Sequence, residues 1–474
     1  MPDAYPREIY LLQPRRLSPE TIAVTFAKTS RSPLSFREIA EGLTDETSAK
    51  FHEKWVVGYG HASVAEHAVL HIAFENVSRL AIECIESNRL ASYTEKSTRY
   101  QKWDAKSYFV PDEVLGTPHE ETYRHVCDAL FTVYGESLDP VRAAAKEKFP
   151  RGKDEDPERY ESRIRSKYVD VCRFLLPSAA LANVGMTANA RVLEHAIRKM
   201  LSHPLDEVRQ IGEEVKQAAQ LETPTLVKYA ERVPYLEKIA LELEAAAQDL
   251  PSRIEAGRTH LLAYEAGAES RVLAAALFAH GDSSYEQAQD MVDAMSPPER
   301  ARLARTLLAG MGDFDTPPRE LEHSAYTFET VLDQGAYFEL KRHRMMTQTA
   351  QELSVHLGYA VPRLINEAGF DTQYHKAMQA AREAYQQLAE WDPHVAAYLV
   401  PNGFNRRVLL TMNLREAYHL CELRSAANAH FSMRRLALQV AEQIREVHPL
   451  LAGFMRLPED VDWRMIEREN FTQV

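Results

Sequence analysis

The chain has 474 residues, of which 45% are hydrophobic and 26% charged, and this is the composition of an ordinary globular protein rather than of a disordered or collagen-like chain. Its formal net charge of −13 repels phosphate backbones, which argues against duplex nucleic acid as the main partner. The chain starts without a signal peptide and has no apolar run of about 18 residues, so we expect a soluble, cytoplasmic protein with no membrane partner.

The first predicted elements are helices that begin at capping signals. Ser18-Pro19-Glu20 places a capping hydroxyl before a proline and an acid, and Ser35-Phe36-Arg37-Glu38 has the pattern of a capping box. Residues 68–75 then alternate between two faces, as a half-buried strand does. The charge-dense stretch 146–167 predicts a solvated surface insertion, and 205–250 has helical spacing.

The same signals return further along the chain. Ser284-Tyr285-Glu286-Gln287 is again a capping box, and Ser296-Pro297-Pro298-Glu299 again starts a helix with proline. Residues 326–332 predict a second half-buried strand. The runs 374–390 and 407–447 have helical spacing and strong helix formers.

Three sequence blocks occur twice, in the same order. Residues 66–75, which begin Glu66-His67, match residues 322–329, which begin Glu322-His323. The intervals from a proline to an asparagine and on to a histidine are equal in the two copies, which are Pro177, Asn189, His195 and Pro401, Asn413, His419. Upstream, Phe26-Ala27-Lys28 resembles Phe278-Ala279-His280, each before its capping box. We interpret this order as an ancient tandem duplication.

The duplication predicts two domains, residues 1–245 and residues 246–474. The first carries a charged insertion near 101–168, and the connection between the halves falls near 240–268, around Gly257. Each half is expected to be a small, mostly antiparallel sheet packed with helices, so the fold class is α+β and rich in helix.

A polar string follows the predicted strand and helix of each half. In the first half it runs from Ser87-Asn88-Arg89 to Arg99-Tyr100, and in the second it starts at Arg342-His343-Arg344. These strings resemble the signature of the flavin-dependent thymidylate synthases, which is Arg-His-Arg, two residues, Ser, one residue, Asn-Glu, one residue, Ser, one residue, Arg-Tyr. Residues 60–67 and Asn189-Ala190-Arg191 also look like that family's motifs.

The resemblance implies a set of site residues, matched motif by motif. Flavin contacts are implied for Ser30, Ser63, Glu66, Asn189, Arg191, Arg342, His343, Arg344, Asn413 and Arg415. Contacts to deoxyuridylate (dUMP) are implied for Glu95, Ser97, Arg99 and Arg173, and Arg424 matches the catalytic arginine that polarises the pyrimidine. Arginine suits both ligands because its guanidinium binds phosphate through bidentate, charge-assisted hydrogen bonds.

Each half departs from the family pattern in a different place. The first half has Ser87-Asn88 where Arg-His belongs, and the second has Ala397 at the position of Arg173 and Arg319 at the position of Ser63. In the second polar string, four signature positions are altered, namely Ala350, Glu352, Ser354 and Val355. Because the losses are complementary, our hypothesis is one composite site per chain, in which 342–344 face Ser97 and Arg99.

Structural roles compete with these assignments. An arginine near a helix end also complements the helix dipole and forms surface ion pairs. His67 and His323 fit satisfied structural histidines as well as functional ones, and His195 and His419 stand where the family has asparagine. Those two fit packing residues or altered ligands better than catalysts.

If the chemistry is intact, the resemblance implies an FAD-dependent reductive methylation of dUMP to dTMP, with methylenetetrahydrofolate as carbon donor and NADPH as reductant. A homodimer that mimics the family's tetramer is expected. No cysteine nucleophile is needed, and the four scattered cysteines, without a CxxC pair, predict buried free thiols.

Two other function classes compete with this one. The first is a non-catalytic homologue that binds flavin or nucleotide, or is only structural, and the altered motifs favour it. The second is a metal-dependent phosphohydrolase, which is disfavoured because His52-Glu53 and His119-Glu120 lack a histidine three residues after the Glu. We therefore expect no metal site.

Overall fold

The computed structural model describes residues 10, 12, 14–30, 32–99, 101–247, 249–250 and 259–472. Tyr100 and the part of the predicted connection around Gly257 lie outside these residues. The chain forms two compact units. Unit 1 comprises Met1–Lys96, Tyr108–Thr117 and Ala179–Pro251, and unit 2 comprises Ser97–Ser107, Pro118–Ser178 and Ser252–Val474. Two segments of the first sequence half therefore belong to unit 2, and the domain boundary at 245 stays a prediction about ancestry.

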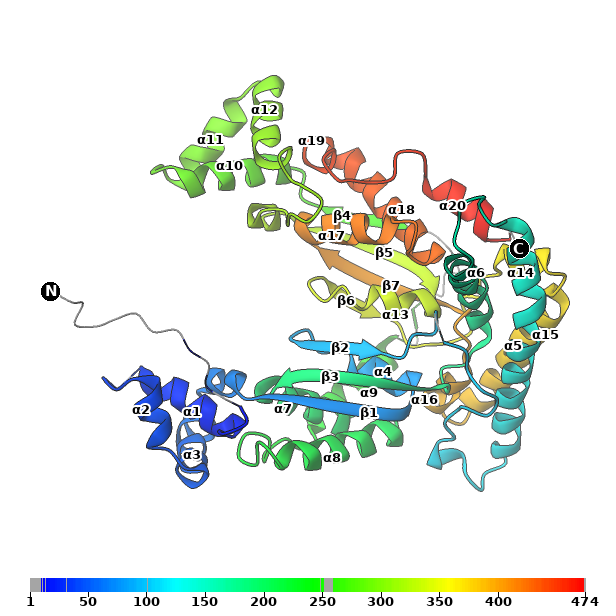
Figure 1. The fold of residues 1–474 in the computed structure, drawn as a ribbon, viewed down its shortest axis with the longest axis horizontal. Coiled ribbons are helices and arrows are strands. Elements are labelled where there is room, and N and C mark those ends of the chain that lie inside the picture. Colours follow the sequence, from blue (N-terminus) through cyan, green and yellow to red (C-terminus); the bar gives the residue numbers. More distant parts are fainter. Residues whose placement is uncertain are drawn as a thin grey trace. The chain divides into compact units, whose positions relative to one another are not determined.

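Unit 1 contains a three-stranded antiparallel sheet. Its strands are β1 (Val69–Ser78), β2 (Ala91–Glu95) and β3 (Leu181–Asn189), in the order β1-β3-β2. The strand predicted at 68–75 is confirmed, with Leu70 and Phe74 buried on one face and His71 exposed on the other. Helices α4 (Arg79–Ile85), α7 (Ala190–Leu201) and α8 (Asp206–Gln220) accompany this sheet (Figure 1).

The remaining elements of unit 1 are short. They are α1 (Pro19–Thr29), α2 (Phe36–Glu41), α3 (Asp45–Phe51), η1 (His52–Gly58), η2 (Ala62–His67), η3 (Asp112–Val114) and α9 (Pro234–Ala247). Ser18 and Ser35 cap α1 and α2 as predicted. The single helical run predicted over 205–250 is wrong between α8 and α9, because Pro224 and Pro234 lack the N–H that a continuous helix needs.

Unit 2 contains a four-stranded antiparallel sheet. Its strands are β4 (Thr259–Tyr264), β5 (Tyr326–Asp333), β6 (Thr347–Ala350) and β7 (Asn405–Met412), in the order β4-β5-β7-β6. The order β5-β7-β6 repeats the order β1-β3-β2 of unit 1, as expected of a duplicated domain. The helix predicted from residue 407 is wrong up to residue 412, where Val408, Leu410 and Met412 are buried at every second position, as in a strand.

The helices of unit 2 cover its sheet and include residues of the charged insertion that was predicted near 101–168. They are α5 (Glu120–Lys148), α6 (Pro157–Cys172), η4 (Arg173–Leu175), α10 (Ala268–His280), α11 (Tyr285–Ala294), α12 (Pro297–Leu308), η5 (Arg319–Glu322), α13 (Gln334–Leu340), α14 (Arg363–Glu367), α15 (Asp371–Ala389), α16 (Pro393–Ala396), η6 (Ala397–Leu399), α17 (Leu414–Ser425), α18 (Phe431–Val447), α19 (Pro449–Ala452) and α20 (Trp463–Asn470). In Figure 1, α17 and α18 lie over the sheet, and α18 contacts β4 and β5.

The charged stretch 146–167 is more than a solvated surface insertion. It forms the end of α5 and most of α6, whose N-terminus is capped by the Asp156 carboxylate. Ile164 is fully buried and Lys167 is half-buried. Most of the stretch is exposed or half-buried, as expected of a solvated feature, but α6 is amphipathic and packs one side against α5.

The sequence predicts no disulfide, no membrane-spanning helix and no metal site, and the statements that follow concern the described residues. All four cysteines are free, and Cys127, Cys172 and Cys421 are buried. In the described part of the chain, no helix is long and apolar enough to cross a membrane. The same residues contain no group of three or more His, Cys, Asp or Glu that could hold a metal ion.

Candidate functional site

Two arginines of the first sequence half meet in unit 2. Arg173 follows the last turn of α6 and is 2% exposed, and its Nη1 donates to Thr98 Oγ1 at 3.0 Å. Arg99 donates from Nε and Nη2 to the two Asp170 carboxylate oxygens, both at 2.8 Å. Asp170 precedes Arg173 by one helical turn, so α6 sets the spacing of this cluster.

A buried carboxylate of the second half completes this cluster. Glu339 lies on α13, whose residues are all buried. Its Oε1 is 3.6 Å from Arg99 Nε and 3.6 Å from Arg173 Nη2, and its Oε2 is 3.4 Å from Arg424 Nη1. Three of the arginines predicted to bind or polarise the nucleotide therefore surround one carboxylate within unit 2.

The ion pairs around Glu339 leave hydrogen-bonding capacity unused. Their separations exceed the roughly 2.7–2.9 Å of a charge-assisted hydrogen bond. Among the described residues, Nε and Nη2 of Arg173 and Oε1 of Glu339 are buried without a hydrogen-bond partner. Buried donors without acceptors are costly, and an oxyanion such as a phosphate supplies the acceptor oxygens that they lack.

His343 links the second polar string to this cluster. The histidine is 2% exposed, its Nε2 accepts from Arg424 Nε at 2.9 Å, and its Nδ1 lies 3.0 Å from Glu416 Oε1. Because Arg424 can only donate, Nδ1 carries the proton and donates to Glu416. Burial lowers the pKa of His343, against the opposing effect of Glu416, so the ring is neutral at pH 7. His343 therefore positions the guanidinium of Arg424.

Acidification below pH 6.5 is expected to destabilise unit 2 through two histidines. Burial lowers the pKa of His343 and lowers that of His430, capping α18, still further below 6.5. The unfolded chain then binds more protons than the folded one, so the contribution present above pH 6.5 is lost as pH falls. Each histidine is expected to cost about 1 kcal/mol between pH 7.5 and 5.5.

Urea midpoints at pH 7.5, 6.5 and 5.5 measure this loss. The variants His343→Gln and His430→Gln should each show a flatter dependence on pH, whatever their stability at pH 7.5. If the urea midpoint depended equally on pH in the wild type and in both variants, these two histidines would not be the cause of the loss of stability at low pH. Glu322, which forms ion pairs with Arg319 and Arg415, does not contribute to this pH dependence. Its pKa is lowered, chiefly by Arg319, so it stays ionised between pH 7.5 and 5.5.

Two other predicted residues of the second half, Asn413 and Arg415, border a separate cavity of unit 2. Asn413 caps α17, with its Oδ1 accepting from the Glu416 N–H at 2.9 Å, and Arg415 binds Pro317 O and Glu322. The cavity measures about 510 Å³, and its lining holds five carboxylates against two arginines, Arg415 and Arg456. Both arginines are paired with carboxylates. Arg342 is exposed and Arg344 half-buried, and neither lines this cavity.

The predicted flavin residues of the first half lie in unit 1. Ser30 and Ser63 line a cavity of about 540 Å³, together with Lys28 and the ring of Trp55. Among the residues that the structure describes, no carboxylate belongs to its lining. Ser30 Oγ donates to Ala27 O at 3.0 Å.

Three further predicted residues are already engaged within unit 1. Asn189 caps α7 through the Val192 N–H, as Asn413 caps α17. Glu66 forms an ion pair with Arg191, as Glu322 does with Arg415. The same cap and the same ion pair thus recur in both units.

Glu95 and Ser97, predicted to bind the nucleotide, lie on either side of the border between the units. Glu95 ends β2, and its carboxylate pairs with Arg79 Nη1 at 2.6 Å, with both side chains at most 3% exposed. Ser97 Oγ accepts from the Arg99 N–H at 3.2 Å. The structure thus engages Glu95 with another residue and sets Ser97 beside the arginine cluster.

Sequence analysis missed the carboxylates of the cluster. Asp170 and Glu339 each lie three residues before a predicted site arginine, and Glu416 follows Arg415. The signal was available for Glu339, because a lone acid in the apolar run Gly335–Leu340 predicts a buried charge that needs a partner.

Comparisons with known proteins agree with the strand order that the two sheets repeat. The family described as "Thymidylate synthase complementing protein" matches residues 14–225 and again 260–450. A UPF0159 protein of Chlamydia muridarum (strain MoPn / Nigg) is 30% identical over 92% of this chain and 90% of its own length. A UPF0159 protein of Thermoplasma acidophilum is 27% identical over 88% and 90%.

A shorter relative shows what one half resembles. A flavin-dependent thymidylate synthase of Clostridium tetani is 27% identical over 45% of this chain and 82% of its own length. One such protein thus corresponds to about half of this chain, whereas the UPF0159 relatives match nearly all of it. The chain therefore belongs to the thymidylate synthase complementing protein family, the family of the flavin-dependent thymidylate synthases, as a tandem of two matching segments.

Proposed function

We propose that this chain binds dUMP at the arginine cluster of unit 2 and catalyses its FAD-dependent reductive methylation to dTMP, with methylenetetrahydrofolate and NADPH as co-substrates. One observation carries the nucleotide part of the proposal. Arg173 keeps two buried N–H donors without acceptors, among three guanidinium groups that share one carboxylate. A phosphate monoester supplies both the negative charge and the acceptor oxygens that this arrangement lacks.

The proposed roles follow from the contacts. Arg99 and Arg173 hold the nucleotide phosphate, with Ser97 fixing the backbone of Arg99. Arg424 is the catalytic residue, which polarises the pyrimidine, and His343 orients it by accepting from its Nε. Burial lowers the pKa of Arg424, with Glu339 acting in the opposite direction. A guanidinium in a buried site is a stronger electrostatic partner than one in water.

The residues of unit 1 fit part of a flavin better than those of unit 2 do. Around Ser30 and Ser63, hydroxyls, aromatic rings and Lys28 surround a cavity without carboxylates, which suits an aromatic anion. These residues would hold the cofactor, which supplies the hydride when bound. The cavity beside Asn413 and Arg415 fits poorly, because its carboxylates repel flavin phosphates. Arg342 and Arg344 stay proposed flavin contacts, and a homodimer stays the proposed assembly.

The acidic cavity of unit 2 supports a second candidate function. If the chain no longer binds flavin in either half, it is a non-catalytic homologue that binds a nucleotide. Assays of dTMP formation from dUMP, with FAD, NADPH and methylenetetrahydrofolate supplied, separate the two functions. Nucleotide binding without turnover would favour the non-catalytic homologue.

The site itself is tested by the visible spectrum of the FAD-loaded protein titrated with dUMP. Removing a charged hydrogen-bonding group costs about 1.5–3 kcal/mol, so Arg99→Gln should weaken dUMP binding roughly 10- to 100-fold. His343→Gln should weaken it less, because it acts through Arg424. Arg142→Gln, which removes a half-exposed cation paired with Glu161, is the matched control. The composite site is wrong if either test variant retains full nucleotide and flavin binding.

A further inference from the structure

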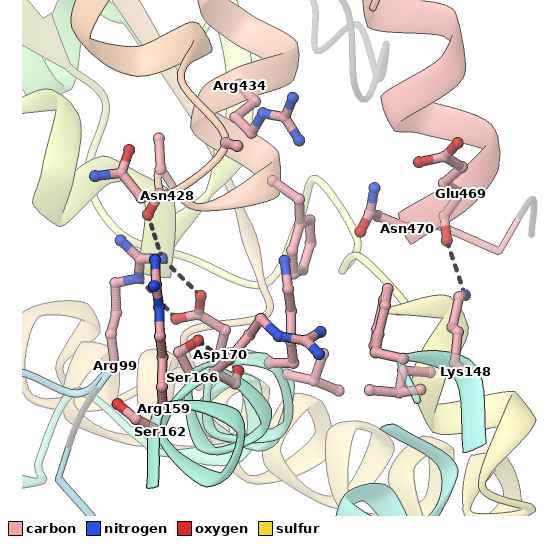
Figure 2. Close-up of a pocket in the computed structure, with 18 residues that line it drawn as sticks. Arg99, Lys148, Arg159, Ser162, Ser166, Asp170, Asn428, Arg434, Glu469 and Asn470 are labelled. Carbon is pink, nitrogen blue, oxygen red and sulfur yellow. Dashed lines mark hydrogen bonds and ion pairs between the residues drawn. The ribbon is translucent and has the colours of Figure 1, made fainter. Parts of the chain in front are cut away.

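A second strongly basic cavity of unit 2 lies beside the arginine cluster. It measures about 390 Å³ and is lined by α6, the ends of α5 and α20, the start of α18 and residues 427–429. Six basic residues line it against two acidic ones, Asp170 and Glu469. Figure 2 shows Arg159 rising from α6 on one side and Arg434 coming from α18 on the other. The charged stretch that resembled a solvated insertion supplies most of these cations.

Three of the six cations are already neutralised by carboxylates. Arg99 binds Asp170, and Arg163 binds both Glu155 oxygens at 2.8 Å. Lys148 Nζ lies 2.8 Å from Glu367 Oε1. Because carboxylates of the protein balance their charges, these three cations do not need a ligand to neutralise them.

The other three cations form no ion pair with a carboxylate. Among the described residues, no carboxylate lies within ion-pair distance of Lys167, Arg434 or Arg159, and the Arg434 guanidinium donates only to Ser425 O, at 3.1 Å. Lys167 and Arg434 are half-buried and Arg159 is exposed. Burial lowers the pKa of Lys167 and of Arg434, against the weaker opposing effects of Asp170 and Glu469. Half-buried charges of one sign raise the local concentration of counter-ions, so this cavity favours an anion with several negative charges.

Apolar side chains form the rest of the lining. The rings of Phe149 and Phe431 are half-buried there, beside Leu364. Lys167 Nζ lies 5.5 Å from the centre of the Phe149 ring, so the cation stands next to an aromatic face. Phe431 is stacked on Phe174 and also contacts the rings of His430 and Phe471, which fix its orientation. The cavity thus combines basic side chains with an aromatic and apolar wall.

We propose that this cavity binds a nucleoside diphosphate, with the diphosphate held by Lys167, Arg434 and Arg159 and the base packed against Phe149 and Phe431. Three cations without carboxylate partners match the roughly three negative charges of a diphosphate. This cavity shares Arg99 and Asp170 with the cluster proposed for dUMP, whereas Arg173, Arg424 and Glu339 do not line it. The three cations that hold the diphosphate have no role in the proposed activity.

Calorimetric titration of the full chain with ADP, UDP and inorganic pyrophosphate tests the inference. The wild type should bind a nucleoside diphosphate more tightly than pyrophosphate, because only the former contacts the rings. The double variant Lys167→Met, Arg434→Gln should bind both at least 100-fold more weakly, since each charged hydrogen bond is worth about tenfold or more. Affinity should also fall steeply with salt.

Two controls make the result specific. Arg142→Gln, whose cation is paired with Glu161 and does not line the cavity, should bind like the wild type. Arg173→Gln should keep the affinity for ADP and UDP while losing that for dUMP. The inference is overturned if the double variant binds all three probes like the wild type, or if Arg173→Gln alone abolishes their binding. Equal affinity for pyrophosphate and both nucleotides would overturn the assignment of a nucleotide.

Discussion

Replacing Glu339 by Gln is expected to lower the free energy of unfolding by about 3–5 kcal/mol, the usual cost of removing one partner of a buried ion pair. Glu339 is 4% exposed, and it forms ion pairs with Arg424, Arg99 and Arg173. Without it, three largely buried guanidinium groups lose the carboxylate that they share. The midpoint of urea unfolding, measured in a buffer free of phosphate, gives the loss.

Phosphate should restore part of the stability of the Glu339→Gln variant. A ligand that binds only the folded state stabilises it by RT ln(1 + [L]/Kd), and the variant offers the phosphate three arginines without the carboxylate that they share in the wild type. We therefore expect 20 mM phosphate to raise the midpoint of the variant more than that of the wild type. Glu367→Gln, which removes the half-exposed partner of Lys148, should cost under about 1 kcal/mol. An equal effect of phosphate on wild type and variant would contradict an anion site at this cluster.

The fold was predictable where local patterns and repetition agree. The strands at 68–75 and 326–332 and the caps at Ser35 and Ser284 were identified because alternation and capping boxes act over a few residues. The strand at 405–412 was missed because it precedes a long helical run, and a short apolar stretch fits both periods. No local signal could show that segments 97–107 and 118–178 join unit 2.

The candidate site was predictable only in part. The resemblance pointed to Arg99, Arg173 and Arg424, which the structure brings around one carboxylate. The carboxylate itself, Glu339, was missed because a family signature marks ligand contacts and not the charges that balance them. The cations of α6 were dismissed as solvated because charge density alone does not show that α18 packs opposite. Burial and pairing are tertiary properties, and they decide which charges can serve a ligand.

Replacing Arg79 alone by Met is expected to cost about 3–5 kcal/mol in unit 1, because the Glu95 carboxylate would stay buried without its cation. Arg79 and Glu95 are 2.6 Å apart, and their side chains are 2% and 3% exposed. Glu95→Met should cost a similar amount, because it removes the carboxylate that pairs with the buried Arg79 guanidinium. The double variant should lie within about 1 kcal/mol of the wild type, since apolar residues of similar volume often replace a buried pair at little cost. Urea unfolding of the four proteins completes the double-mutant cycle.

The same cycle decides what Glu95 does. The side chain is buried and its carboxylate binds Arg79, so the stable double variant should bind dUMP with the wild-type dissociation constant. In that case the signature position of Glu95 holds a structural carboxylate in this chain. A folded double variant that binds dUMP tenfold or more weakly would instead assign Glu95 to the nucleotide, as the family signature implies. The comparison is informative only because the double variant removes both charges and leaves no buried ion behind.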